Sequence, residues 1–261
     1  MKRSRRHALG QHFLASPAVL ERIVRVIDPR ADDLVVEVGA GRGALTFRLA
    51  EKAGRVVAIE KDERLLPGLR EAVPGNVEVV AADVLRADFE DLVPPPHRGR
   101  AKLVGNLPYA ISSPLLFKVL AARRLFAAAV FLIQKEVARR VCAGPGTKDY
   151  APLSILLQSA FEARLEFTVA PGSFVPPPKV NSALISLRRR PAPLLEVADE
   201  AGFAAFLRRA FGQRRKKLRN TLASYGAQEV AAAAEALGIP ENARAEEVPM
   251  ETLASLFREL V

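Results

Sequence analysis

Short apolar runs that alternate with stretches of helical character constrain the fold of this 261-residue chain more than any other feature. The five runs are LVVEV at 34–38, RVVAI at 55–59, NVEVV at 76–80, KLVG at 102–105 and AAAVFLI at 127–133. Apolar strands that alternate with helices are typical of a parallel sheet covered on both faces. The sequence therefore predicts an α/β fold with a mostly parallel sheet.

The pattern changes in the last third of the chain. Two strand-like segments, 162–169 and 181–188, flank a proline-rich loop, and helical periodicity alone follows the prolines at 191 and 193. The expected helices there cover 201–211, 214–224, 227–237 and 249–260. We therefore predict a sheet domain over 1–190 and a small, all-helical domain over 191–261.

Helix boundaries are also readable near the start of the chain. Ser16 followed by Pro17 is a typical N-cap and first helical position, and a helix is expected from there to Ile27. Another is expected over 44–53, and a third after Asp62. Pro67-Gly68 lies inside that third helix, which we expect to be kinked or shortened.

Positive charge is concentrated rather than spread along the chain. The formal net charge is +10, and 14 of the 39 Lys and Arg residues lie in 1–6, 188–190 and 208–219, which contain no acid. The rest of the chain is therefore net acidic. Clustered cations indicate binding of a phosphate backbone, although a single run of this kind is often only a solvated face. The candidate RNA-binding residues are Arg208, Arg214, Arg215, Lys216, Lys217 and Arg219.

Several classes of protein are excluded on composition. No apolar stretch approaches the roughly 20 residues that cross a bilayer, and no apolar segment follows the basic N-terminus as in a secretory signal. A lone Cys142 excludes an intramolecular disulfide and a cysteine-based metal site. We expect a cytoplasmic protein that uses no metal and has no need to be more than a monomer.

The glycine-rich turn after the first strand fits two cofactor classes. Gly39, Gly41 and Gly43 allow close backbone approach, either to a dinucleotide pyrophosphate or to the methionine part of S-adenosylmethionine (SAM). The third glycine comes one residue too early for the dinucleotide fingerprint. A tight strand–helix turn without a ligand has the same appearance, so the turn alone does not decide.

Acidic residues follow neighbouring strands at the edge where open α/β sheets bind ligands. Glu60, at the end of the second strand, is placed to accept hydrogen bonds from ribose hydroxyls in either cofactor class. Asp83 and the adjacent Val84 follow the third strand, where the carboxylate suits an exocyclic amine such as that of adenine. Glu37 precedes the glycine turn and is a candidate partner for a methionine ammonium. Solvated loop ends and helix caps are the structural alternatives for all three acids.

The segment Asn106-Leu107-Pro108-Tyr109, after the fourth strand, indicates the reaction. The lone pair of an adenine amine is delocalised into the ring, so the amine is a poor nucleophile. Two acceptors, the Asn106 side-chain oxygen and the carbonyl of Leu107 or Pro108, would localise that lone pair on nitrogen. Tyr109 offers a face on which a flipped base stacks. Phe174, before the three prolines 176–178, is a candidate for the opposite wall of the pocket.

These motifs, taken in order, resemble the ribosomal RNA adenine dimethyltransferases of the small subunit. The resemblance is carried by GQHFL (10–14), VVEVGAGRGALT (35–46), AIEKD (58–62), AADVL (81–85), GNLPY (105–109), APLSILLQ (151–158), FVPPPKVNSALISL (174–187) and FGQRRKKLRNTL (211–222). It implies a Rossmann-like SAM-dependent methyltransferase that adds two methyl groups to each of two adjacent adenosines in a hairpin near the 3′ end of small-subunit rRNA. It also implies a SAM site that includes Gln11, His12 and Leu14, together with Gly39, Glu60, Asp83 and Asn106. The family more often has asparagine at the position of His12.

Three other functions stay open at this point. Resistance methyltransferases that act on large-subunit RNA share the glycine turn and the NLPY-like motif, but FGQRRKKLRN favours the small-subunit enzymes. A non-catalytic RNA-binding assembly factor that keeps the fold is disfavoured by the intact Glu60, Asn106 and Tyr109. A nicotinamide-dependent dehydrogenase is disfavoured by the glycine spacing and by the lack of an evident hydride-transfer residue.

Overall fold

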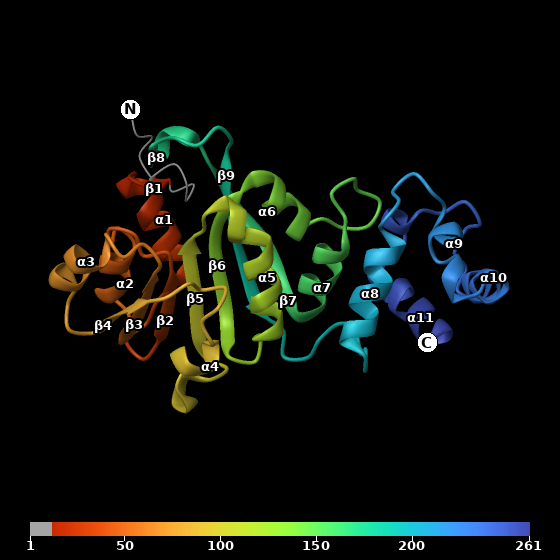
Figure 1. The fold of residues 1–261 in the computed structure, drawn as a ribbon, viewed down its shortest axis with the longest axis horizontal. Coiled ribbons are helices and arrows are strands. Elements are labelled where there is room, and N and C mark those ends of the chain that lie inside the picture. Colours follow the sequence, from red (N-terminus) through yellow and green to blue (C-terminus); the bar gives the residue numbers. More distant parts are fainter. Residues whose placement is uncertain (1–11) are drawn as a thin grey trace. The chain divides into compact units, whose positions relative to one another are not determined.

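The computed structural model describes residues 12–261, and the five predicted runs form neighbouring strands in it (Figure 1). They are β2 (Leu34–Val38), β3 (Arg55–Glu60), β4 (Val77–Ala81), β5 (Ala101–Asn106) and β6 (Phe126–Gln134). With β9 (Ser182–Arg189) and β7 (Phe161–Val169) they form one sheet in the order β4-β3-β2-β5-β6-β9-β7. Pairing from β4 to β6 is parallel, and β9 joins β6 antiparallel. The predicted mostly parallel α/β fold is confirmed.

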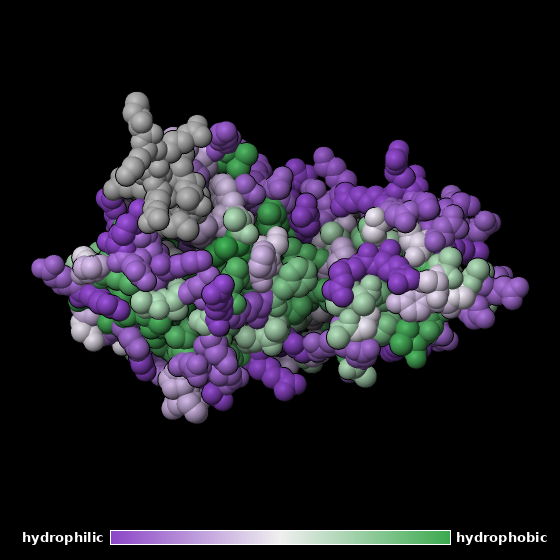
Figure 2. All heavy atoms as spheres, in the orientation of Figure 1, coloured by the Kyte–Doolittle hydropathy of each residue, from purple (hydrophilic) through white to green (hydrophobic). Residues whose placement is uncertain are grey.

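Helices bury both faces of this sheet. On one face, α1 (Pro17–Ile27) and α2 (Thr46–Ala50) share an apolar cluster with Val35, Val104 and Val130. On the other face, α5 (Ser112–Ala121) lies in front of the sheet in Figure 1 and buries Leu115, Leu116 and Val119. Apolar side chains are visible over α5 in Figure 2, and this helix also carries the 44% exposed Phe117.

Local sequence signals explain where these helices begin. Ser16 caps α1 by accepting a hydrogen bond from the amide of Val19, and Pro17 is its first residue, as predicted. Pro67 lies in the first turn of α3 (Leu66–Ala72), where its missing N–H costs nothing. Of the two outcomes expected for the helix after Asp62, the structure shows the shortened helix, because α3 begins only at Leu66, next to the proline. The short helix α4 (Phe89–Leu92) is capped by Asp88.

A separate two-stranded ribbon joins segments that are far apart in the sequence. β1 (Phe13–Leu14) pairs antiparallel with β8 (Phe174–Val175), so that Phe13 faces Val175 and Leu14 faces Phe174. The carbonyl of Ser173 also accepts hydrogen bonds from the amides of Ala15 and Ser16. This ribbon lies next to α1 and brings the N-terminal motif and the proline-rich loop together (Figure 1).

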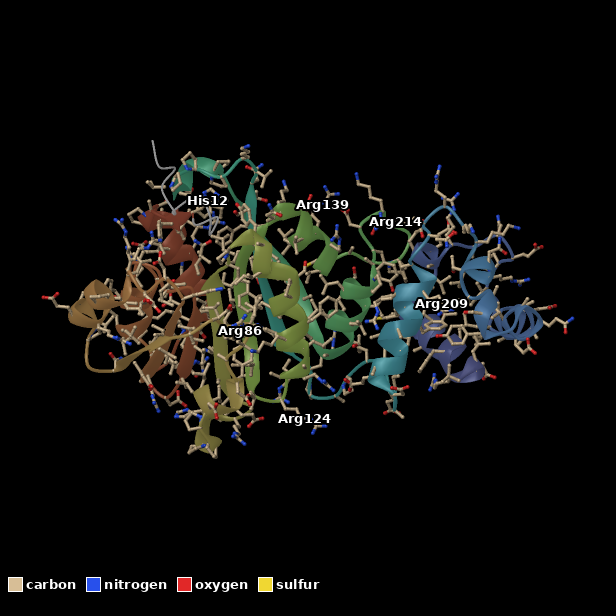
Figure 3. The ribbon with its side chains drawn as sticks, in the orientation of Figure 1. His12, Arg86, Arg124, Arg139, Arg209 and Arg214 are labelled. Carbon is tan, nitrogen blue, oxygen red and sulfur yellow. The ribbon has the colours of Figure 1, made fainter. Side chains whose placement is uncertain are left out.

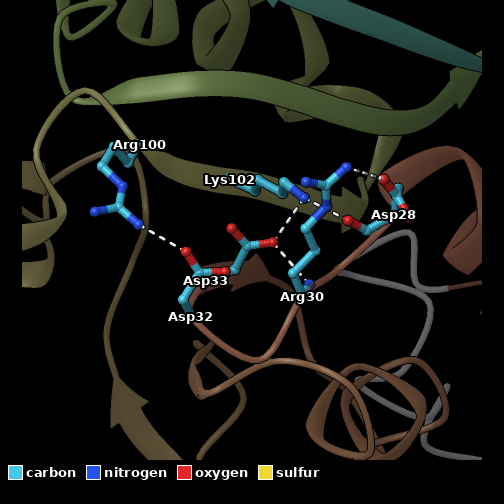
Figure 4. A network of polar contacts seen from close by, with 6 residues as sticks. All are labelled: Asp28, Arg30, Asp32, Asp33, Arg100 and Lys102. Carbon is cyan, nitrogen blue, oxygen red and sulfur yellow. Dashed lines mark hydrogen bonds and ion pairs between the residues drawn. The ribbon is translucent and has the colours of Figure 1, made fainter.

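The amino-terminal edge of the central strands is held by ion pairs (Figure 4). Lys102 at the start of β5 pairs with Asp33, just before β2, at 2.7 Å, and both side chains are largely buried (16% and 13% exposed). Arg100 pairs with Asp32 at 2.8 Å. The polar residues that follow the strands lie at the opposite, carboxyl edge, because the strands from β4 to β6 are parallel.

The second compact unit consists of residues 139–161 and 190–261. Its longer helices are α7 (Pro152–Ala160), α8 (Glu200–Ala210), α10 (Ala227–Ala236) and α11 (Met250–Leu260), joined by the short α9 (Leu218–Thr221). Phe206, which is fully buried, packs against Phe257 and Tyr225 with ring centroids 5.5 and 5.8 Å away. These aromatic contacts lie in an apolar core of the unit's own.

Two expectations for this region differ from the structure. The segment 139–161 was expected in the sheet domain but belongs to the helical unit, because Tyr150 and Ile155 are part of the core of that unit. The segment begins within α6 (Lys135–Val141). The expected helix over 214–224 is shortened to α9 and a 3-10 turn (Ala223–Tyr225), since Lys217 is extended at the N-cap and four consecutive cations repel one another. Within the described chain, every helix is too short or too polar to span a bilayer.

Candidate active site

A cavity of about 250 Å³ opens at the carboxyl ends of β2, β3, β4 and β5. Its wall contains the following residues predicted from the sequence: His12, Gly39, Gly41, Glu60, Asp83, Val84, Asn106, Leu107, Pro108, Tyr109 and Phe174. A second cavity, of about 570 Å³, shares Gly39, Gly41 and Asn106 with the first and adds Leu14 and Glu37. The structure thus brings together the predicted residues that it describes in the sheet unit, whereas Gln11 and the basic cluster at 1–6 lie outside the described residues.

The glycine turn takes a backbone path that side chains would obstruct. Gly39, Gly41 and Gly43 all have positive φ, at 74°, 61° and 85°. A Cβ at Gly43 would meet the Phe47 ring at 2.7 Å, and one at Gly41 would meet the Phe13 ring at 3.1 Å. The amide of Gly39 donates to the carbonyl of Ile59, which ties the turn to the end of β3. The turn is therefore rigid and exposes backbone to the cavities.

Glu60 is buried at the floor of the first cavity with its carboxylate held in place. One oxygen accepts a hydrogen bond from the amide of Gly41 at 2.8 Å, and the other accepts one from the amide of Asp62 at 2.7 Å. The side chain is 5% exposed. Since each carboxylate oxygen has a further lone pair, Glu60 is still able to accept two hydroxyl donors from the cavity.

Asp83 also lines this cavity, as half of an ion pair. Lys61 approaches one oxygen at 2.8 Å and the amide of Leu85 donates to the other at 3.0 Å. The hydrogen bond from Lys61 is the main cause of a pKa below the usual value for an aspartate, and the Leu85 amide adds to it. Asp83 is therefore an ionised acceptor, next to the buried Val84.

A hydrogen bond fixes the orientation of the side-chain amide of Asn106. Its Nδ2 donates to the backbone carbonyl of His12 at 2.9 Å. A carbonyl only accepts, so the flipped amide would place two acceptors face to face. No donor among residues 12–261 approaches the Oδ1 atom, which lies on a residue of the cavity wall.

The carbonyl groups that follow Asn106 are not equivalent. The carbonyl of Pro108 accepts hydrogen bonds from the amide of Ile111 at 3.0 Å and the hydroxyl of Ser112 at 3.4 Å. The carbonyl of Leu107 has no such partner in the described part of the chain, while its amide donates to Leu132. Of the two carbonyls that the sequence left open, Leu107 is the one with a vacant acceptor.

Aromatic rings complete the wall of the first cavity. The ring of Tyr109 lies 5.8 Å from that of His12, centroid to centroid, at an interplanar angle of 36°. Nδ1 of His12, a residue labelled in Figure 3, donates to the carbonyl of Pro176 at 2.8 Å and so links β1 to the proline-rich loop. Phe174 comes from β8 and is 3% exposed.

Glu37 lies under the glycine turn, in the wall of the second cavity. The carboxyl is 2% exposed and accepts a hydrogen bond from the hydroxyl of Thr46 at 2.6 Å. Burial raises the pKa of Glu37 to about 7, and the Thr46 hydrogen bond only partly opposes this shift. Near neutral pH Glu37 is therefore poised between a neutral acid and a carboxylate.

The cavity walls also contain residues that were not predicted from the sequence as site residues, among them Phe13 and Asp62. Phe13 contacts both cavities, and the Arg42 guanidinium lies 5.5 Å from its ring centroid. Asp62 is 7% exposed in the first cavity and binds Arg64. The motif GQHFL signals Phe13, but only the β1–β8 pairing shows that its ring packs on the turn. Across the described residues, no three His, Cys, Asp or Glu side chains are grouped as for a metal ion.

The predicted RNA-binding residues lie in the helical unit. Arg208 is in α8, Arg219 is half-buried in α9, and the remaining four are exposed on the loop between those helices. Lys217 is ion-paired with Glu241 at 3.3 Å. In Figure 2 this unit shows hydrophilic side chains mixed with apolar ones, and Arg214 is labelled in Figure 3. The loop thus presents four exposed cations, of which Lys217 is paired with an acid.

Comparisons with known proteins agree on one family. The profile described as "Ribosomal RNA adenine dimethylase" matches residues 2–261. A "Ribosomal RNA small subunit methyltransferase A" of Geobacter metallireducens is 43% identical over 262 residues, with 98% of this chain and 95% of that protein covered. A protein of the same name from Xylella fastidiosa is 42% identical, with 95% and 93% covered.

Solved structures give the same result. A dimethyladenosine transferase from Plasmodium falciparum superposes with a TM-score of 0.81 at 26% identity, over 94% of this chain and 96% of that one. The 23S rRNA methyltransferase ErmE superposes with a TM-score of 0.74 at 33% identity, over 95% and 99%. The similarity therefore includes the C-terminal helices as well as the sheet.

The raised pKa of Glu37 predicts a specific pH dependence of stability. Between pH 4.5, the ordinary value, and about 7, the folded state holds a proton that the unfolded state has lost. The free energy of unfolding of the wild type should thus fall, relative to Glu37→Gln, as pH rises through this window, by about 1.4 kcal/mol per unit of pKa shift. Denaturant unfolding of both proteins at pH 5 and pH 8 measures the difference.

Thr46→Val is the companion variant. Loss of the Thr46 hydrogen bond, which lowers the pKa of Glu37, should extend the same fall to higher pH. The difference in unfolding free energy between wild type and Glu37→Gln could instead be the same at pH 5 and pH 8. This result would show that the folded protein does not retain the Glu37 proton.

Proposed function

The chain belongs to the ribosomal RNA adenine dimethylase family, and we propose that its cavity is where SAM-derived methyl groups are added to N6 of adenosines in small-subunit rRNA. Curated relatives at 42–43% identity carry small-subunit names, whereas the 23S enzyme is 33% identical. The large-subunit alternative is therefore not favoured. The proposed substrate is the immature small subunit, and the proposed place of action is the cytoplasm.

The residues around the two cavities fit SAM. Glu60 is oriented to accept hydrogen bonds from both ribose hydroxyls, and the ionised Asp83 is placed for the adenine amine. Glu37, in the second cavity, is the candidate partner of the methionine ammonium, because a neighbouring cation would favour its carboxylate form. Bound SAM supplies a methyl carbon made electrophilic by a positively charged sulfur.

The direction of the Asn106 amide is the observation that carries the proposal. With Nδ2 bound to the carbonyl of His12, Oδ1 is available to accept one N–H of the target amine. The carbonyl of Leu107 is available for the other. Two fixed acceptors favour a tetrahedral nitrogen, and this geometry withdraws the lone pair from the ring and directs it outward. A fixed base is unnecessary, since an alkylated ammonium is strongly acidic.

Tyr109 and Phe174 are proposed to hold the flipped adenine. Both line the cavity together with Asn106. Extraction of a base from its stack costs a few kcal/mol, and stacking on an aromatic ring returns roughly 1–3 kcal/mol per base.

The helical unit is proposed to bind the rRNA backbone through the cationic loop between α8 and α9. Exposed Lys and Arg bind phosphates and release counterions, a contribution that is independent of base sequence. The sheet unit is correspondingly the proposed catalytic part. We propose that the reaction needs no metal, because the methyl group on the sulfonium is already activated. We also propose that the protein acts as a monomer.

Asn106→Ala tests this function directly. The variant should lose methyl transfer by about 100-fold or more, as for loss of an essential electrostatic contact. Because Asn106 also lines the proposed SAM cavities, the dissociation constant of SAM is measured separately and should change much less than the rate of transfer. The assay is tritium incorporation from labelled SAM into small-subunit particles from a strain that lacks the enzyme. Wild type that labels no adenosine would refute the function, and an Asn106→Ala variant that still labels adenosine would refute the role of this side chain. An inactive Asn106→Ala variant that binds RNA normally and restores every cellular phenotype would favour the non-catalytic assembly factor.

Neutralisation of the cationic loop tests the RNA interface. Replacement of Arg214, Arg215 and Lys216 by alanine should weaken binding to the particle and reduce the slope of log K against log[salt] by about 1 for each phosphate that the loop no longer neutralises. Arg258→Ala, an exposed cation on α11, is the matched control. A slope equal to that of the wild type would place the RNA elsewhere.

A further inference from the structure

The hydroxyl of Tyr109 has a specific partner that the proposed chemistry leaves unexplained. It lies 2.9 Å from the hydroxyl of Ser182. Ser182 is 1% exposed and is the first residue of β9, where it faces Gln134 of β6 in the antiparallel pairing. A ring at the cavity is thus hydrogen-bonded to a side chain fixed in the sheet.

Stacking alone does not require this hydroxyl. A base stacks on the face of an aromatic ring, and a phenylalanine would offer an equivalent face. The backbone at Tyr109 is already fixed, since it opens a 3-10 turn directly after Pro108. The remaining freedom is rotation of the ring about its side-chain bonds. A hydrogen bond from the far end of the ring to a buried serine removes that freedom.

We propose that Ser182 is a positioning residue that sets the plane of the Tyr109 ring for the target adenine. The inference rests on the proposed function and adds a residue that does not itself line the first cavity. Its effect is greatest when one base receives two methyl groups. For the second transfer the site must bind a monomethylated adenine, whose amine is bulkier. If the Tyr109 ring is free to rotate, the base is released after one transfer.

Ser182→Ala and Tyr109→Phe each break the hydrogen bond and keep the ring. Each should lower the single-turnover rate on deficient small-subunit particles by about threefold to tenfold, the worth of one neutral hydrogen bond. Each should raise the share of N6-monomethyladenosine among the products, as measured by mass spectrometry of nucleosides. The dissociation constant of SAM should stay that of the wild type.

A double-mutant cycle separates positioning from a general loss of structure. If the two hydroxyls act through each other, Ser182→Ala/Tyr109→Phe should equal either single variant. Ser186→Ala is the matched control: it removes a buried hydroxyl four residues along the same strand, which donates to Glu166 at 2.5 Å. It should keep the wild-type product ratio.

Four results would overturn the inference. The first is a wild-type rate and a wild-type product ratio in both single variants, and the second is an effect of Ser182→Ala without an effect of Tyr109→Phe. The third is a double variant whose loss of rate equals the sum of the two single losses in free energy. The fourth is the same rise in monomethyladenosine in Ser186→Ala. Wild-type protein that methylates no adenosine would refute the proposed function instead, so the two failures are distinguishable.

Discussion

The hydrogen bond from Asn106 Nδ2 to the carbonyl of His12 is the interaction on which the proposed chemistry depends. It fixes which end of the amide faces the cavity, and it joins the end of β5 to His12, which lies 94 residues earlier in the chain and directly before β1. That strand is itself held by β8 and by the carbonyl of Ser173. The β1–β8 ribbon thus fixes the orientation of the Asn106 amide. This orientation places an acceptor, Oδ1, at the cavity, where it suits an N–H donor.

Acceptors dominate the carboxyl edge of the sheet, and each is oriented by a bond to the protein. Glu60 is held by two amides, Asp83 by Lys61 and an amide, and Asn106 by a carbonyl. Such preorganisation removes the cost of orienting polar groups at the moment of reaction. The ion pairs around Lys102 keep the opposite edge together, which separates what stabilises the strands from what binds at their ends.

Much of the fold and of the candidate site was readable from the sequence because strands end where their apolar runs end. Glu60, Asp83 and Asn106 follow three such runs, and parallel pairing places them at the same edge of the sheet, with β2 between Glu60 and Asn106. The β1–β8 pairing, the direction of the Asn106 amide and the Tyr109–Ser182 bond were not readable, since each is a long-range contact without a local pattern. The helix expected over 214–224 was mispredicted, because the prediction relied on the apolar periodicity and gave too little weight to the repulsion within the run of cations. In the structure only Leu218–Thr221 of this segment forms an α-helix.

A crystal structure with an adenosine in the target site and a SAM analogue beside it tests the central claim most directly. The measured quantities are the distances from N6 of the adenosine to Oδ1 of Asn106 and to the carbonyl oxygen of Leu107. The account predicts that both lie in the usual hydrogen-bond range of about 2.7–3.2 Å, with Nδ2 still on the carbonyl of His12. An Asn106 side chain turned from the base, or one that presents Nδ2 to it, would contradict the account.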